Sequence, residues 1–139
     1  MSTRERRDRS NESDRFLSQL IHKAIQDLGE AELGKEIALA AVGGYGRGEL
    51  SPGSDLDILF IHSGRVSSEK LKALVNEVLY PLWDTKSVDH SVRTRSETRD
   101  AATSDLRVAT GLLDIRLITG NADLVANVQS DALELWRKN

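Results

Sequence analysis

The chain of 139 residues is long enough for one domain with a hydrophobic core and too short for two. A net charge of −3 gives no reason to expect nucleic-acid binding, and the absence of cysteine from the sequence excludes disulfides and thiolate metal sites. No apolar run approaches the roughly 20 residues of a membrane span, and the N-terminus lacks the apolar core of a secretory signal. We therefore expect a cytoplasmic domain that binds neither nucleic acid nor membrane.

The N-terminal third of the sequence predicts a tail, a helix and a strand. Residues 1–12 mix arginine with acidic and small polar residues, so we expect a disordered tail there and a folded domain over 13–139. From Ser13, apolar residues recur three and four positions apart, as on one face of a helix, and Gly29 is a suitable end. The short apolar run 36–42 then predicts a buried strand ahead of a glycine-rich turn.

Helical and strand patterns alternate in the rest of the chain. Residues 55–62 predict a second strand, and the apolar positions of 71–82 form one face of a helix. Apolar and polar residues alternate over 86–94, which predicts a third strand. From Ser96 onward the pattern is helical, with Gly120 as a break.

This order of elements predicts an α/β (α+β) domain in which a small mixed β-sheet is flanked by helices. Trp83 and Trp136 lie on apolar faces of their predicted helices, so we expect both in the core. The helical pattern continues to the last residues, which we interpret as a fragment of a longer protein.

The stretch 41–60 combines a glycine-rich turn with a carboxylate pair. Asp55 and Asp57 are two residues apart in a predicted strand, so both carboxylates leave the same face. Two such groups repel each other unless a cation lies between them, and their hard oxygen ligands suit Mg²⁺ or Mn²⁺. The turn holds glycines at positions 43, 44, 46 and 48, and their backbone N–H groups can approach a phosphate. A phosphate cradle beside a metal-binding carboxylate pair is typical of phosphoryl or nucleotidyl transfer.

Other phosphate-binding motifs do not fit this turn. Gly48 is followed by Glu49 rather than Lys-Ser/Thr, which excludes a P-loop, and the last glycine of the dinucleotide fingerprint is missing. The structural alternative is a tight turn followed by solvated aspartates. As nucleotide contacts we expect Ser54 and Arg47, although Arg47 could instead pair with Glu49. We expect Gly44 to be the position where an added side chain would block the phosphates most directly.

Three stretches resemble the nucleotidyltransferase domain of the bacterial PII-protein uridylyltransferases, which are DNA polymerase beta-like nucleotidyltransferases. They are GGYGRGELSPGSDLDILF, LYPLWDTKSVDHSVRT and DLRVATGLLDIRLITGN. The resemblance implies the nucleotidyltransferase fold, with Gly43 and Gly44 at the triphosphate and Mg²⁺ (or Mn²⁺) on Asp55 and Asp57. It implies transfer of a nucleoside monophosphate from UTP, or from ATP in the actinobacterial branch, to a tyrosine of the PII signal protein. It also implies that the HD and ACT domains of full-length members are absent here.

Nucleotidyltransferases of this fold usually have a third carboxylate, which helps to bind the metal and accepts the proton of the attacking hydroxyl. Asp89, in the middle of the third predicted strand, is our candidate for this catalytic and metal-binding role, and Asp114 is the alternative. The structural explanation of Asp89 is a surface ion pair with Arg93 or Lys86.

Two classes of function fit these patterns. The first is a metal-dependent nucleotidyltransferase, and the second is a catalytically weak nucleotide-binding or partner-docking module of the same fold. The presence of both Asp55 and Asp57 favours the enzyme, because a binding module has no need to keep both. A toxin-type or antibiotic-modifying nucleotidyltransferase shares the Asp-x-Asp pattern but not YGRGEL or DHSVRT.

Overall fold

The computed structural model describes residues 2–50, 55–83 and 87–138. At its centre is a four-stranded mixed sheet with the strand order β3-β2-β1-β4. β1 (Ile37–Ala41) pairs antiparallel with β2 (Leu56–His62) and with β4 (Arg116–Gly120), while β3 (Val88–Thr94) runs parallel to β2. The predicted fold class, an α/β (α+β) domain with a small mixed sheet flanked by helices, is confirmed.

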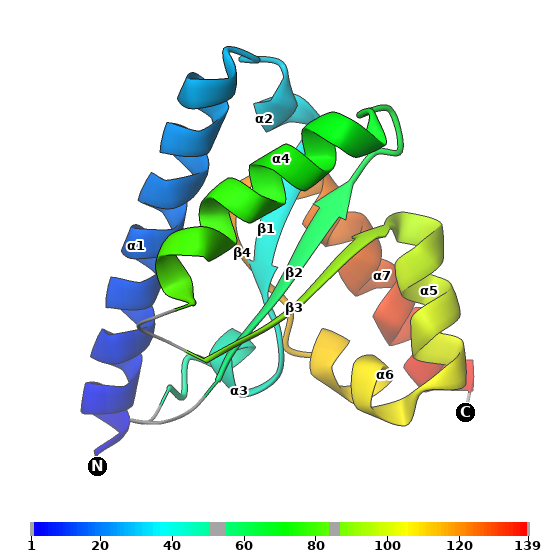
Figure 1. Ribbon diagram of the computed structural model, residues 1–139. Coiled ribbons are helices and arrows are strands. Elements are labelled where there is room, and N and C mark those ends of the chain that lie inside the picture. Colours follow the sequence, from blue (N-terminus) through cyan, green and yellow to red (C-terminus); the bar gives the residue numbers. More distant parts are fainter. Residues whose placement is uncertain (1, 51–54, 84–86, 139) are drawn as a thin grey trace.

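Helices cover both faces of the sheet. As Figure 1 shows, one face carries α1 (Thr3–Leu28) and α4 (Ser68–Leu79), and the other carries α5 (Arg95–Ser104), α6 (Leu106–Leu112) and α7 (Ala122–Lys138). Successive residues of β1 belong alternately to the two hydrophobic clusters on these faces, so this strand is buried on both sides. A continuous apolar run, rather than an alternating one, is what such a central strand requires.

Local sequence signals set several helix ends. Gly29 ends α1 in the left-handed conformation, at φ 67°. The Ser67 side chain accepts a hydrogen bond from the Lys70 backbone N–H and so begins α4. Thr94 and Glu97 form a reciprocal capping box at the start of α5. The remaining elements are single turns: α2 (Leu33–Glu36), α3 (Gly43–Gly46) and the 3₁₀ turn η1 (Tyr80–Leu82).

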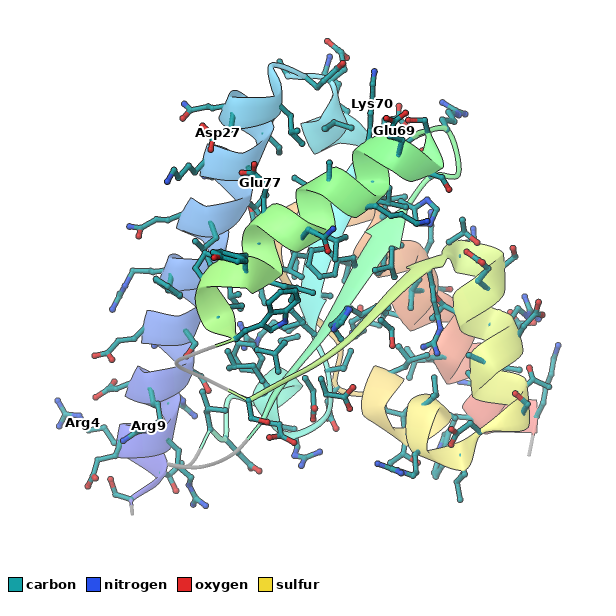
Figure 2. The ribbon with its side chains drawn as sticks, viewed as in Figure 1. Arg4, Arg9, Asp27, Glu69, Lys70 and Glu77 are labelled. Atoms are coloured by element: carbon teal, nitrogen blue, oxygen red, sulfur yellow. The ribbon has the colours of Figure 1, made fainter. Side chains whose placement is uncertain are left out.

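The outer surfaces of α1 and α4 carry charged side chains. Figure 2 labels six of them: Arg4, Arg9, Asp27, Glu69, Lys70 and Glu77. Lys70 also ties α4 to the turn after α1, because its Nζ lies 2.7 Å from the Glu30 carboxylate. Within the described ranges, no helix is both long enough and apolar enough to cross a membrane.

The first helix is longer than the sequence predicts. It begins at Thr3, well before the predicted start at Ser13, so residues 3–12 of the segment expected to be a disordered tail are helical. Ser2 caps this helix by accepting a hydrogen bond of 3.1 Å from the Glu5 backbone N–H. Ser10 is buried although it lies outside the apolar stripe. The cap stabilises the first turn of a segment that has no apolar face of its own, whereas the buried Ser10 hydroxyl has no hydrogen-bond partner among the described residues.

Strand β4 is a second difference from the sequence prediction, which places only helices after Ser96. Residues 116–120 instead form an edge strand that pairs with β1. Gly120 ends it at φ +105°, where a Cβ atom would lie 2.5 Å from the Ile37 carbonyl oxygen. The strand is too short and too close to the preceding helical pattern to be separated from it by periodicity.

The two tryptophans are not in the core, so that prediction is wrong. Trp83 and Trp136 are 61% and 62% exposed. Trp83 follows the 3₁₀ turn after α4 and makes an edge contact with Tyr80, with ring centroids 6.1 Å apart, and Trp136 lies near the end of α7.

Candidate active site

A cleft of about 510 Å³ lies where β2 and β3 enter the sheet. The turn after β1 and the first residues of β2 and β3 form one side, and α6 forms the opposite wall. Its lining residues are Val42, Gly43, Asp55, Asp57, Leu59, Asp89, Ser91, Asp105, Arg107, Val108, Gly111 and Leu112.

Three of the four carboxylates that line this cleft are placed there by strand periodicity and register. Asp55 and Asp57 are separated by one residue at the start of β2, so they share a face. The parallel pairing of β2 and β3 places Asp57 directly opposite Asp89, on strands that are typically about 4.8 Å apart. Within the part of the chain that the structure describes, however, no three His, Cys, Asp or Glu side chains converge tightly enough to hold a metal ion by themselves.

The electrostatics of the cleft act most strongly on Asp57. Partial burial raises the pKa of its carboxyl above the ordinary value, and the negative charges of Asp89 and Asp55 raise it further. The positive charge of Arg107 acts in the opposite direction. The cleft therefore holds an excess of negative charge that a cation would neutralise.

The glycine turn adjoins these carboxylates. Its helix α3 follows β1 directly, and the Val42 backbone N–H donates to the Asp57 carbonyl at 3.0 Å. Gly43 lines the cleft with φ +58°, and a Cβ atom there would lie 3.2 Å from Asp57 Oδ2. This residue therefore needs glycine for both its conformation and its close approach.

Gly44 differs from the expectation drawn from the sequence. Its φ is not positive, it is not among the residues that line the cleft, and a Cβ atom there would make ordinary contact, at 3.5 Å, with the Arg47 guanidinium. Gly43 rather than Gly44 is thus the position where a side chain would intrude on the cleft.

Arg47 lies outside the cleft, in two ion pairs. Its guanidinium donates to the Glu49 carboxylate at 3.2 Å and to Asp114 Oδ2 at 2.9 Å. This arrangement matches the ion-pair alternative for Arg47. Asp114 is held by the same contact, on the far side of the turn from the cleft, so Asp89 is the third carboxylate that the geometry favours.

Two of the sequence expectations near Asp89 fall outside the described residues, namely the nucleotide contact of Ser54 and an ion pair with Lys86. Among the residues that are described, Asp89 has no ion pair, with Arg93 or with any other cation. Its exposed carboxylate at the sheet edge faces the cleft instead.

Arg107 is the residue that the sequence analysis missed. It is the single cationic side chain among the described residues that line the cleft, and it lies on α6 opposite the carboxylates. Asp105 begins this helix by accepting a hydrogen bond of 2.9 Å from the Arg107 backbone N–H. The start of α6 could be predicted, because Asp105 is a helix-capping residue followed by an apolar run. The position of α6 opposite β2 could not be predicted from the sequence.

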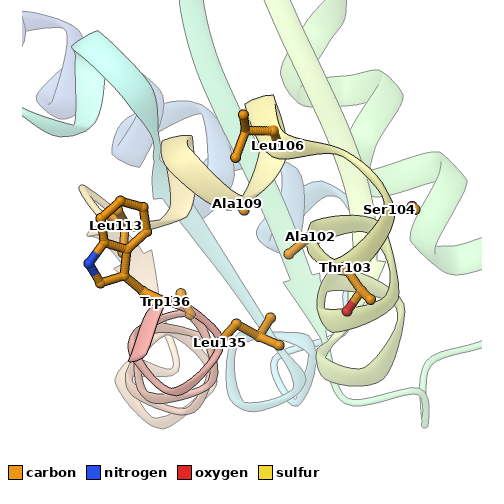
Figure 3. Close-up of a pocket in the computed structure, with 9 residues that line it drawn as sticks. Ala102, Thr103, Ser104, Leu106, Ala109, Leu113, Leu135 and Trp136 are labelled. Carbon is orange, nitrogen blue, oxygen red and sulfur yellow. The ribbon is translucent and has the colours of Figure 1, made fainter. Parts of the chain in front are cut away.

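A second hollow, of about 450 Å³, lies between α5, α6 and α7 (Figure 3). Apolar side chains such as Leu106, Leu135 and Trp136 line most of it, and none of its lining residues is ionisable. It therefore lacks the groups that acid–base or metal chemistry requires.

The oxygen ligands of the acidic cleft suit a magnesium ion that keeps water and phosphate ligands, rather than a metal ion enclosed by protein side chains alone. Mg²⁺ is usually held by one or two carboxylates together with waters and substrate phosphates. The cleft supplies such carboxylates in Asp55, Asp57 and Asp89, and it has room for a phosphate chain beside Gly43. The absence of a tight three-ligand cluster among the described residues agrees with this open arrangement.

Comparisons with known proteins agree with the fold. The family model described as "Nucleotidyltransferase domain" matches residues 21–107. The chain is 49% identical over 102 residues to a bifunctional uridylyltransferase/uridylyl-removing enzyme of Streptomyces coelicolor, and 41% identical over 121 residues to one of Mycobacterium tuberculosis. These alignments cover 73% and 86% of this chain but only 12% and 15% of the relatives.

Solved structures show the same fold at low sequence identity. A structure described as a toxin–antitoxin with AMP-PNP has a TM-score of 0.52 and 15% identity, over 87% of both chains. From the family match and the close relatives together, the chain belongs to the nucleotidyltransferase domain family.

Proposed function

We propose that this domain transfers a nucleoside monophosphate from UTP or ATP to a tyrosine hydroxyl of the PII signal protein, with Mg²⁺ (or Mn²⁺) in the acidic cleft. The observation that carries the proposal is the register of β2 and β3, which puts Asp57 beside Asp89 in the cleft that Gly43 and Arg107 also line. The identity to uridylyltransferases supports the choice of acceptor and nucleotide.

Each residue has a distinct part in this reaction. The Gly43 backbone approaches the phosphate chain, and the Arg107 guanidinium binds the phosphates from the α6 side. When bound, the metal ion neutralises the carboxylates and the developing negative charge on the phosphates. Asp55 and Asp57 would hold that ion through their carboxylate oxygens.

The acceptor approaches from the sheet edge. Asp89 is exposed on edge strand β3, where a protein acceptor can reach it, whereas Asp57 is half-buried behind it. Asp89 accepts the proton of the tyrosine hydroxyl while the hydroxyl oxygen bonds to the α-phosphorus. The bond from the α-phosphorus to the leaving pyrophosphate breaks in the same displacement.

The test is to incubate the domain with a PII protein, Mg²⁺ and either UTP or ATP, and to weigh the PII protein by mass spectrometry. The proposal predicts the mass of one added nucleoside monophosphate with one of the two nucleotides. An unchanged mass with both, from a domain that nevertheless binds nucleotide, would instead favour the binding module.

A further inference from the structure

A polar network behind the glycine turn ties it to two distant parts of the chain. The Tyr45 hydroxyl donates to Asp14 Oδ1 at 2.6 Å, and the Arg116 guanidinium pairs with the other oxygen of the same carboxylate. Asp14 lies on α1 and Arg116 begins β4, so the network joins both elements to α3. None of the three residues lines the acidic cleft.

The same guanidinium also holds the backbone of the turn. Arg116 Nη2 donates to the Tyr45 carbonyl at 3.0 Å and Nε donates to the Gly46 carbonyl at 3.2 Å. These carbonyls lie at the C-terminal end of α3, where the Tyr45 carbonyl also accepts from the Gly48 backbone N–H at 3.0 Å. The guanidinium carbon also lies 5.3 Å from the centre of the Tyr45 ring.

Close packing fixes the turn from the same side. A Cβ atom on Gly46 would overlap the Asp114 carbonyl oxygen, so the turn lies directly against the chain that leads into β4. The Arg47–Asp114 ion pair ties the same two segments together. Tyr45 itself is 1% exposed, and burial together with its bond to Asp14 raises the pKa of its hydroxyl, which stays a donor.

A four-residue helix does not hold its own position, because helix nucleation is unfavourable without tertiary contacts. We propose that Asp14, Tyr45 and Arg116 form a clamp that fixes the Gly43 backbone beside Asp57, which makes Arg116 a positioning residue for the nucleotide phosphates. The predicted effect of the clamp on nucleotide binding rests on the proposed function. Its predicted effect on the Gly43 backbone rests only on the contacts that hold α3. Arg116 acts through the turn and touches no substrate.

The test is the variant Arg116→Lys, which keeps the charge but loses the planar fork that reaches both carbonyls. The matched control is Arg95→Lys, since Arg95 makes a bidentate pair with Asp131, at 2.8 Å for both bonds, away from the cleft. Three quantities are measured for each variant of the 139-residue chain: the melting temperature, the amide signal of Gly43 by NMR, and the Kd for nucleotide with Mg²⁺.

We expect Arg116→Lys to shift the Gly43 amide signal and to raise the nucleotide Kd by about 10- to 100-fold. Arg95→Lys lowers the melting temperature without either effect. A wild-type Kd in Arg116→Lys, or a Gly43 amide that Arg116→Lys leaves unchanged, overturns the clamp. If the wild-type domain binds no nucleotide, the proposed function fails, and the Gly43 amide alone then decides whether the clamp exists.

Discussion

Replacing Gly43 with alanine tests whether the glycine turn serves the cleft or only the fold. At φ +58° an alanine is strained by about 1–2 kcal/mol, and its Cβ atom would lie 3.2 Å from Asp57 Oδ2. The carboxylate has to retreat by a few tenths of an ångström to relieve that contact. For a chain of this size we expect a loss of about 4–8 °C in melting temperature.

The matched control is Gly44→Ala, one residue along the same turn. Its φ is not positive and its nearest neighbour is the flexible Arg47 side chain, at 3.5 Å. Removing a glycine at a compatible position stabilises by about 0.4–1 kcal/mol, so its melting temperature should stay level or rise.

Thermal unfolding and nucleotide titration with Mg²⁺, both run on the two variants, provide the assay. We predict that folded Gly43→Ala protein, kept well below its melting temperature, binds nucleotide much more weakly than folded Gly44→Ala protein. If the folded fraction of Gly43→Ala binds as the wild type does, the glycine is structural and the phosphates do not approach it. If Gly44→Ala is the more damaging change, the assignment of the cleft wall to Gly43 is wrong.

Two further predictions concern charged side chains. Arg107→Ala should raise the nucleotide Kd by about 10- to 100-fold, because a charge-assisted phosphate contact is lost. Arg47→Ala should lower the melting temperature and leave the Kd near the wild-type value, so equal Kd values for the two variants would refute this prediction. The hydrogen bonds from Arg95 lower the pKa of buried Asp131. The pair therefore contributes its full stabilisation above the unfolded pKa of about 3.9, and this stabilisation is lost as the pH falls through the lower folded pKa. The melting-temperature deficit of Asp131→Asn should therefore be complete at neutral pH and shrink below about pH 4, and a deficit that grows on acidification would contradict it.

The sequence allowed the prediction of the elements whose signals are local. β1 and β2 are apolar runs bounded by glycine or aspartate, and the spacing of Asp55 and Asp57 is enough to place both on one face of a strand. β4 escaped prediction because its state is decided by pairing with β1 rather than by its own five residues. The exposure of Trp136 likewise depends on tertiary packing, because this side chain lies at the open hollow between α5, α6 and α7.

The parts of the site that sequence reasoning missed join residues that are far apart in the chain. Arg116 and Asp14 are 102 positions apart, and no local pattern marks them as partners. Arg107 has the same explanation, since its place in the cleft depends on how α6 packs against α3, opposite the start of β2. Arg47 carried a misleading local signal, because a cation in a glycine turn suggests phosphate binding while its partner Asp114 lies far along the sequence.

The central claim is that the acidic cleft is where metal and nucleotide bind together. The most direct measurement is a titration of the wild-type domain and of Asp57→Asn with UTP and ATP, each with and without Mg²⁺, beside the melting temperature of both proteins. The account predicts Mg²⁺-dependent binding by the wild type and its loss in Asp57→Asn. The variant should melt no lower than the wild type, because the substitution removes a carboxylate that Asp89 and Asp55 repel. Mg²⁺-dependent binding of wild-type strength in Asp57→Asn would contradict the account.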